Sequence, residues 1–194
     1  MKKNFLALMM LLVFAGMAGA AENSKTLVAV FSRADENYAV GFIEKGNTMI
    51  LAEMIAERTG ADLFEIRTAK PYPVDYNECT DVAKKEQNEN ARPALAEDKD
   101  ISGYDTIFLG YPCWWGDLPM AVFTFLEAHD FSGKRVIPFC THEGSGMGRT
   151  EGSLRKTLPG AKILKGLAVR GATAQNSRDE ARKTVTSWLN GLGF

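Results

Sequence analysis

The sequence predicts an α/β protein with a doubly wound, five-stranded parallel sheet and helices on both faces. Short apolar runs alternate along the chain with segments of helical pattern, which is typical of strands joined by right-handed helical crossovers. Several of these runs are almost continuous in Val, Ile, Leu and Phe. Such uniform runs are expected when helices cover both faces of a parallel sheet.

Five segments have the length and composition of buried strands. The first, third and fourth along the chain are the most continuously apolar, and the second is the shortest. In chain order, the expected strands are residues 27–31, 63–66, 106–110, 135–140 and 163–169.

Helical patterns fill the segments between these strands. Residues 48–59 form one expected helix, which ends at Gly60, and residues 120–129 form another, which follows Pro119, a favourable residue at a helix start. The remaining helices are expected at residues 75–90, around Leu154 and at residues 177–192.

The first twenty residues have the features of a cleaved secretory signal. Lys2 and Lys3 precede an apolar stretch at residues 5–14, and the small residues 18–20 fit a cleavage site. The apolar stretch is shorter than the roughly 20 residues that cross a bilayer, so an uncleaved membrane anchor is the weaker alternative. We therefore expect residues 1–20 to be removed and residues 21–194 to form one domain. The protein would then be exported, to the periplasm or outside the cell.

The charge of the expected mature chain argues against a nucleic-acid partner. Without residues 1–20, 21 basic and 24 acidic residues remain, which gives a net charge of −3. Proteins that bind nucleic acids usually carry clustered Lys and Arg and have a high pI.

The cysteines and histidines do not predict a catalytic nucleophile or a metal site. His129 and His142 are the only histidines, too few for a convincing metal cage. Cys113 and Cys140 end two strands that are expected to be neighbours, so a disulfide between them is conceivable. The alternative is that they are small buried hydrophobic residues. Cys79 lies on a polar helix, away from both.

Three loops are selected as a ligand site, because a doubly wound sheet binds ligands beyond the carboxyl ends of its strands. The first loop follows residue 31 and carries hydroxyl, amide and guanidinium donors ahead of a helix N-terminus, which suits a phosphate group. Asp35 and Glu36 oppose this interpretation, and a simple helix cap remains an alternative. The candidate residues are Ser32, Arg33, Asn37, Asn47 and Thr48.

The second loop follows residue 110 and contains two adjacent tryptophans. Trp114 and Trp115 cannot both point into one core position, whereas a flat aromatic ligand offers one of them a stacking partner. The alternative is that one indole packs over the sheet edge and the other closes a subunit interface. The candidate residues are Pro112, Cys113, Trp114, Trp115 and Gly116.

The third loop follows residue 140 and is rich in glycine, which lets the backbone approach a ligand closely. Its N–H groups are suited to the polar edge of a heterocycle. His142 either stabilises negative charge on such a ring or is an ordinary loop histidine. The candidate residues are Thr141, His142, Glu143, Gly144, Ser145 and Gly146.

Together these segments resemble the three FMN loops of flavodoxin-like proteins. The resemblance rests on residues 26–32 with 46–48, residues 104–112 with 114–116, and residues 141–142 with 144–146. It implies a flavodoxin-like sheet with strand order 2-1-3-4-5 and FMN as the cofactor. By the same resemblance, the first loop holds the phosphate, the second flanks the ring and the ribityl chain, and the third meets the pyrimidine edge.

The first loop departs from the family's compact phosphate loop. About a dozen residues separate Ser32 from residues 46–48, and Asp35 stands where glycine would be expected. The resemblance favours a flavin-dependent oxidoreductase that passes electrons from a reduced donor to a quinone or a protein. A simple electron carrier, or a flavodoxin-fold binding module that has lost FMN, remains an alternative. The identities of donor and acceptor stay open, as does a homodimer.

Overall fold

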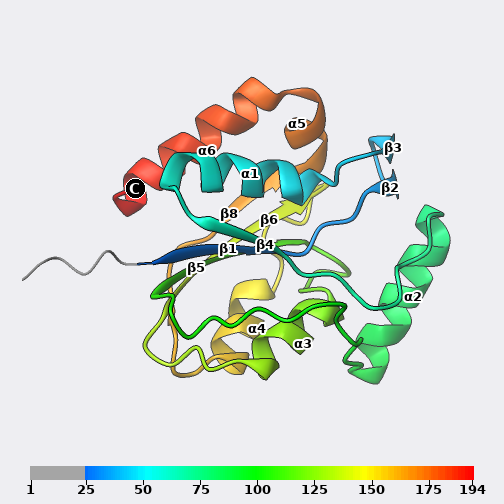
Figure 1. The fold of residues 1–194 in the computed structure, drawn as a ribbon. Coiled ribbons are helices and arrows are strands. Elements are labelled where there is room, and N and C mark those ends of the chain that lie inside the picture. The colour runs from blue at the N-terminus through cyan, green and yellow to red at the C-terminus, as the bar shows by residue number, and fades with distance from the viewer. Residues whose placement is uncertain (1–24) are drawn as a thin grey trace, which may run out of the picture.

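A parallel sheet forms the middle layer of the structure, a computed structural model that describes residues 25–194 (Figure 1). The expected signal at residues 1–20 lies outside the described residues. The strand order is β4-β1-β5-β6-β7, with β8 also paired to β6, and every pair in this sheet is parallel. The predicted order 2-1-3-4-5 is therefore confirmed. The strands are β1 Thr26–Val30, β4 Asp62–Glu65, β5 Thr106–Pro112, β6 Arg135–His142, β7 Lys162–Ile163 and β8 Leu167–Arg170.

Helices cover both faces of this sheet (Figure 1). Three of them, α1, α5 and α6, lie on one face, and α2, α3 and α4 lie on the other. All five predicted helices are found: the four predicted with ends lie within one residue of them, and α4 contains Leu154, around which a helix was expected. Helix α5 was not predicted. The helices are α1 Asn47–Thr59, α2 Tyr76–Glu89, α3 Met120–Ala128, α4 Thr150–Thr157, α5 Gly171–Asn176 and α6 Arg178–Leu192. Among residues 25–194, no helix has both the length and the apolarity needed to cross a membrane.

The core is divided by the sheet into two hydrophobic clusters, and alternate strand residues face each of them. Along β1 and the residue after it, Leu27, Ala29 and Phe31 pack on the side of α3 and α4. Val28 and Val30 pack on the side of α1 and α6. Both faces of the strand are buried, which explains why its sequence is continuously apolar rather than alternating.

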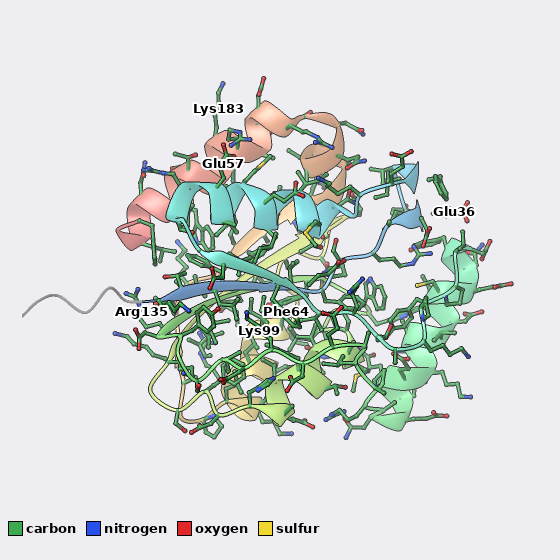
Figure 2. All side chains as sticks on the ribbon, in the orientation of Figure 1. Glu36, Glu57, Phe64, Lys99, Arg135 and Lys183 are labelled. Carbon is green, nitrogen blue, oxygen red and sulfur yellow. The ribbon has the colours of Figure 1, made fainter. Side chains whose placement is uncertain are left out.

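Side chains follow the same layering (Figure 2). Phe64 on β4 is partly buried and packs against the core, with its ring centroid 5.9 Å from that of Phe125 on α3. Glu57 on α1 and Lys183 on α6 project from the outer surface of the helical layer. Charge therefore lies on the outside of the helices, and the sheet surfaces are left for apolar contacts.

The fifth predicted strand, residues 163–169, is wrong as a single element, because it is broken into β7 and β8. Strand β7 pairs with the start of β6, and β8 pairs with its end. The break faces Pro138 of β6. Val136 accepts a hydrogen bond from Leu164 on this side of the strand, and Pro138, two residues further, faces the same side. Because proline has no N–H to donate, the ladder is interrupted there.

The long first loop folds into a hairpin that was not predicted. Strand β2 (Asp35–Asn37) pairs antiparallel with β3 (Gly41–Ile43). The base of the hairpin is closed, since a Cβ atom at Gly46 would lie 2.3 Å from Ser32 Oγ. Asp35, which replaces an expected glycine, has a φ of 66° in the left-handed region that glycine favours. The two halves of the divided loop are thus adjacent in space.

Gly110 on β5 tests how tightly the sheet is packed against the helices. A Cβ atom at this position would lie 2.2 Å from Cζ of the buried Phe139 ring. We expect Gly110→Ala to lower the free energy of unfolding by about 1–3 kcal/mol, because the ring must shift within a filled core. Urea unfolding measures this change. Gly103→Ala is the control, since a Cβ atom there meets nothing within 4 Å. Equal stability of the two variants would contradict the prediction.

Candidate functional site

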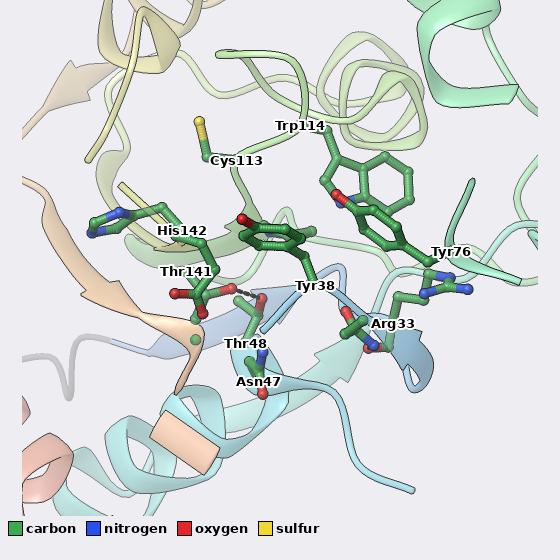
Figure 3. Close-up of a pocket in the computed structure, with 13 residues that line it drawn as sticks. Arg33, Tyr38, Asn47, Thr48, Tyr76, Cys113, Trp114, Thr141 and His142 are labelled. Atoms are coloured by element: carbon green, nitrogen blue, oxygen red, sulfur yellow. Dashed lines mark hydrogen bonds between the residues drawn. The ribbon is translucent and has the colours of Figure 1, made fainter. Parts of the chain in front are cut away.

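The carboxyl ends of β1, β5 and β6 open into a cleft with a volume of about 150 Å³ (Figure 3). All three predicted loops contribute to it. Of the predicted residues, Ser32, Trp115, Gly116, Gly144, Ser145 and Gly146 do not line the cleft wall. Tyr38, Tyr76 and Gly171 line it although they were not predicted. The predicted residues on the wall are Arg33, Asn37, Asn47, Thr48, Pro112, Cys113, Trp114, Thr141, His142 and Glu143.

One end of the cleft is the N-terminus of α1. The N-cap residue is Gly46, which has no side chain to cap the helix. Ser32 replaces that cap, because its Oγ accepts a hydrogen bond from Met49 N at 3.0 Å. The N–H groups of Asn47 and Thr48 stand in the first helical turn, where no intrahelical acceptor exists. This end of the cleft therefore presents N–H donors and the positive end of the helix dipole.

Asn47 and Thr48 have different environments at this end. The hydroxyl groups of Thr48 and Thr141 are 2.7 Å apart and buried, so the first and third loops are joined by a hydrogen bond (dashed in Figure 3). The Oδ1 atom of Asn47 is buried and has no hydrogen-bond partner among the described residues. A buried acceptor without a partner is costly unless a ligand or a water satisfies it.

Arg33 and Asn37 hold the hairpin in place. The guanidinium of Arg33 donates to the carbonyl oxygens of Pro73 and Val74, each at 2.7 Å, and to that of Glu36. The amide of Asn37 donates to nearby backbone carbonyls at the start of the hairpin. Arg33 thereby joins the hairpin to the segment before α2, and both of its terminal nitrogens are already used.

The two adjacent tryptophans lie in different places. The Trp114 ring lines the cleft and packs edge to face against Phe31 and Tyr72, with ring centroids 5.3 and 5.0 Å away. Trp115 is 49% exposed and lies outside this cleft, and its Nε1 donates to Thr80 O on α2 at 3.0 Å. Trp114 is therefore the indole that the cleft offers to a flat ligand.

Asp117 connects the second loop to the third, which sequence reasoning did not predict. Its backbone exchanges two hydrogen bonds with that of Trp114. Its Oδ2 accepts from Arg149 Nε at 2.8 Å and from Ser153 Oγ at 2.9 Å. Arg149 also donates its backbone N–H to Gly116 O. The local sequence around Asp117 does not predict these hydrogen bonds, because Arg149 and Ser153 lie more than thirty residues away along the chain.

The third loop is held by hydrogen bonds of its own side chains. The Nδ1 atom of His142 accepts from Gly144 N at 2.9 Å, so the proton of the neutral ring is on Nε2. Burial, and secondly the charge of Arg170, lower the pKa of His142, although Glu143 acts in the opposite direction. The imidazole is therefore neutral at pH 7.

Glu143 faces the start of α5. Its Oε1 accepts from Ala172 N at 2.7 Å, and its Oε2 lies 3.9 Å from Arg170 Nη1. A helix N-terminus stabilises a carboxylate in this position. The negative charge is thus compensated locally, and the cap explains why a helix as short as α5 begins at Gly171.

Two tyrosines extend the aromatic wall of the cleft. Tyr38, at the turn of the hairpin, is 63% exposed, and its ring centroid is 6.0 Å from that of Tyr76 on α2. Figure 3 shows the Tyr38 ring at the cleft between Thr141 and Trp114. In the sequence, the signal that could have identified Tyr38 as a cleft residue is that it is aromatic in an otherwise polar loop.

The three cysteines are free thiols in the structure. Burial raises the pKa of Cys140 to about 12, with a smaller contribution from Cys113, so this thiol stays protonated at neutral pH. Cys140 is thus the small buried residue that the sequence left as one of two alternatives. Within residues 25–194, no three His, Cys, Asp or Glu side chains are grouped as metal ligands.

Fold and site together define a doubly wound α/β protein with a ligand cleft at the carboxyl edge of its sheet. The chain belongs to the flavodoxin family, because the model of that family matches residues 36–190. No curated protein matches the chain.

Solved structures with the same fold support this assignment. A candidate flavoprotein from Bacteroides eggerthii is 33% identical, with a TM-score of 0.70 over 89% of this chain and 99% of its own. A second one, from Bacteroides uniformis, is 32% identical, with a TM-score of 0.69 over 86% and 98%. A flavoprotein from Lactobacillus acidophilus in complex with FMN is 19% identical, with a TM-score of 0.61 over 79% and 99%. At 19% identity, the similarity to the Lactobacillus acidophilus protein shows a shared fold alone.

The hydrogen bond between His142 and Gly144 predicts a pH dependence of the third loop. Because the pKa of His142 is lower in the folded than in the unfolded chain, its contribution to stability is complete above pH 6.5. That contribution is lost as the pH falls through the folded pKa, when Nδ1 gains a proton and stops accepting. We expect the NMR signal of the Gly144 amide to titrate with a midpoint below 6.5. The titration should be absent in His142→Phe, and a midpoint at or above 6.5 would contradict the prediction.

Proposed function

We propose that this protein binds FMN in the cleft and acts as an oxidoreductase that passes electrons from a reduced donor to a quinone or a protein acceptor. The observation that carries the proposal is the meeting of three loops, from the ends of β1, β5 and β6, around one cleft. Its two ends differ chemically, since one presents N–H donors and the other an indole face. FMN has the matching asymmetry of a phosphate and a flat ring.

The residues at the α1 end fit the phosphate and ribityl parts of FMN. The N–H groups of Asn47 and Thr48 suit a dianion, because unpaired donors and the helix dipole favour negative charge. Asn47 Oδ1, buried without a partner among the described residues, suits a ribityl hydroxyl, which is a donor. Ser32, Arg33 and Asn37 would serve indirectly, by holding the helix start and the hairpin.

The residues at the other end fit the ring. Trp114 would face the flavin plane, with Pro112 and Cys113 beside it. The backbone from Thr141 to Gly146 would meet the polar ring edge, where Gly144 and Gly146 have φ values of 136° and 59° that only glycine adopts readily. Trp115 and Gly116 would shape the turn that holds Trp114. Bound FMN would supply reversible uptake of one or two electrons, and the protein its position and electrostatic surroundings.

An electron carrier without substrate chemistry is the second candidate. A carrier needs a charged docking surface for its partners, and a net charge of −3 for the mature chain gives little steering. Bleaching of the FMN-loaded protein by NADH or NADPH, followed by recovery with a quinone, supports the enzyme. A failure to turn over with any of these, together with fast exchange with redox proteins, supports the carrier.

The first test is direct titration of the purified protein with FMN. Binding should shift the visible flavin spectrum and quench flavin fluorescence, whereas an unchanged spectrum would favour a fold that has lost FMN. We expect Asn47→Ala to weaken binding about tenfold, the equivalent of ~1.4 kcal/mol, because one buried hydrogen bond to the cofactor is lost. Asn77→Ala, at an exposed position on α2, is the control and should leave affinity unchanged. Equal affinities of the two variants would argue against this placement of FMN.

We also propose that the protein is exported and takes up FMN outside the cytoplasm. The support is the sequence of residues 1–20, which has a basic start, an apolar stretch and small residues before Ala21. Expression in a Gram-negative host should give a periplasmic product whose N-terminal sequencing begins at Ala21. Leu12→Arg, which interrupts the apolar stretch, should retain the protein in the cytoplasm. A folded, flavin-loaded product found only in the cytoplasm in both cases would refute export.

A further inference from the structure

Asp117 and Arg149 tie the second loop of the cleft to the segment that follows the third loop. Neither residue lines the cleft, and Asp117 is only 9% exposed. One carboxylate oxygen of Asp117, Oδ1, accepts from Leu118 N at 2.9 Å. The other, Oδ2, accepts from Arg149 Nε and from Ser153 Oγ at the start of α4. Three donors therefore satisfy a nearly buried charge, and one of them is itself charged, which strengthens the bond.

The same two segments also meet backbone to backbone. Gly116 O accepts a hydrogen bond from Arg149 N at 2.9 Å. A Cβ atom at Gly148 would lie 2.5 Å from Gly116 O and 3.2 Å from Cys113 Sγ. A side chain at residue 148 would therefore push the segments apart. The ion pair between Asp117 and Arg149 spans an interface in which the two backbones are already in contact.

The turn that carries Trp114 depends on this interface. Its two central residues, Trp115 and Gly116, have positive φ values of 50° and 76°. A bulky residue persists in that conformation only where surrounding contacts hold it. Asp117 ends the turn, and its backbone exchanges two hydrogen bonds with that of Trp114. Fixing Asp117 to Arg149 therefore fixes the Trp114 indole relative to the third loop.

We propose that Asp117 and Arg149 are positioning residues of the cofactor site, which set the distance between the Trp114 indole and the third loop. The flavin ring of the proposed function is the group that this arrangement receives, so the inference rests on that function. Neither side chain touches FMN. The pair holds both walls in one geometry before the cofactor arrives, and preorganisation of this kind reduces the entropy lost on binding.

Titration of the purified protein with FMN and with riboflavin tests this role. We expect Asp117→Asn, which keeps the shape of the side chain and removes its charge, to weaken FMN binding about tenfold, because the ion pair with Arg149 is lost. Riboflavin, which lacks the phosphate, should be weakened by the same factor, since the defect lies at the ring. A loss confined to FMN would place the defect at the phosphate end and overturn the proposal, as would unchanged affinity for both flavins.

Arg149→Gln tests the other partner, whose side chain is 62% exposed and can be replaced without disturbing the core. It should also weaken both flavins. The double variant should bind no more weakly than Asp117→Asn alone, because the two side chains act through one bond. Additive losses would contradict the pairing.

Arg155→Gln is the matched control for Arg149→Gln. The Arg155 side chain is 57% exposed, and its ion pair with Glu151 stays within α4. Its replacement should leave the affinities for FMN and riboflavin unchanged. A loss equal to that of Arg149→Gln would show that any arginine of this region has the same effect, and would refute a specific role of the pair.

The fluorescence of the bound flavin separates positioning from a general loss of stability. Contact with an indole quenches flavin fluorescence, so at saturation with FMN the Asp117→Asn complex should be brighter than the wild-type complex. A variant that is only less stable has the wild-type brightness once it is saturated. Wild-type brightness in Asp117→Asn would therefore show a purely structural role and overturn the proposal.

The same titrations distinguish this inference from the proposed function. If the wild-type protein binds FMN and the variants of Asp117 and Arg149 bind it equally well, the inference fails and the proposed function stands. If the wild-type protein binds neither flavin, the proposed function fails and the inference fails with it.

Discussion

Burial of both faces of the sheet is the constraint on which the site depends. Leu27 and Val28 are fully buried on opposite faces, and the rest of β1 after Thr26 is apolar and buried as well. Polar chemistry is therefore confined to the strand ends. The hydrogen bond between the Thr48 and Thr141 hydroxyl groups is an example, because it joins the start of α1 to the end of β6 where both line the cleft. Its burial fixes the distance between the first and third loops.

Local composition was sufficient to predict the strands and most of the cleft wall, whereas the sheet order followed from the resemblance to flavodoxin-like proteins. Apolar runs define strands, and the residues directly after three of these runs must meet at one edge. The two tryptophans could not be told apart in this way, since they have the same neighbours in sequence. Their roles depend on Tyr72 and Thr80, which approach from other parts of the chain.

Features that depend on distant partners could not be predicted. The link from Asp117 to Arg149 and the cap of α5 by Glu143 each join segments about thirty residues apart. The division of the last strand is different, because its cause was visible in the sequence as Pro138. Its effect falls on the neighbouring strand, however, and only the register shows which neighbour loses the hydrogen bond. A proline inside a predicted strand is therefore informative about its partner.

The inserted hairpin shows how a compact loop can be lengthened without loss of its geometry. The entropic cost of closing a loop rises only slowly with its length, so about ten extra residues are inexpensive if the ends still meet. They meet here because Gly46 has no side chain and packs directly on Ser32, whose hydroxyl then caps α1. The added residues are free to bring Tyr38 to the cleft and, through Arg33, to fix the segment before α2. The hairpin and the start of α2 are consequently joined, and both border the cleft through Tyr38 and Tyr76.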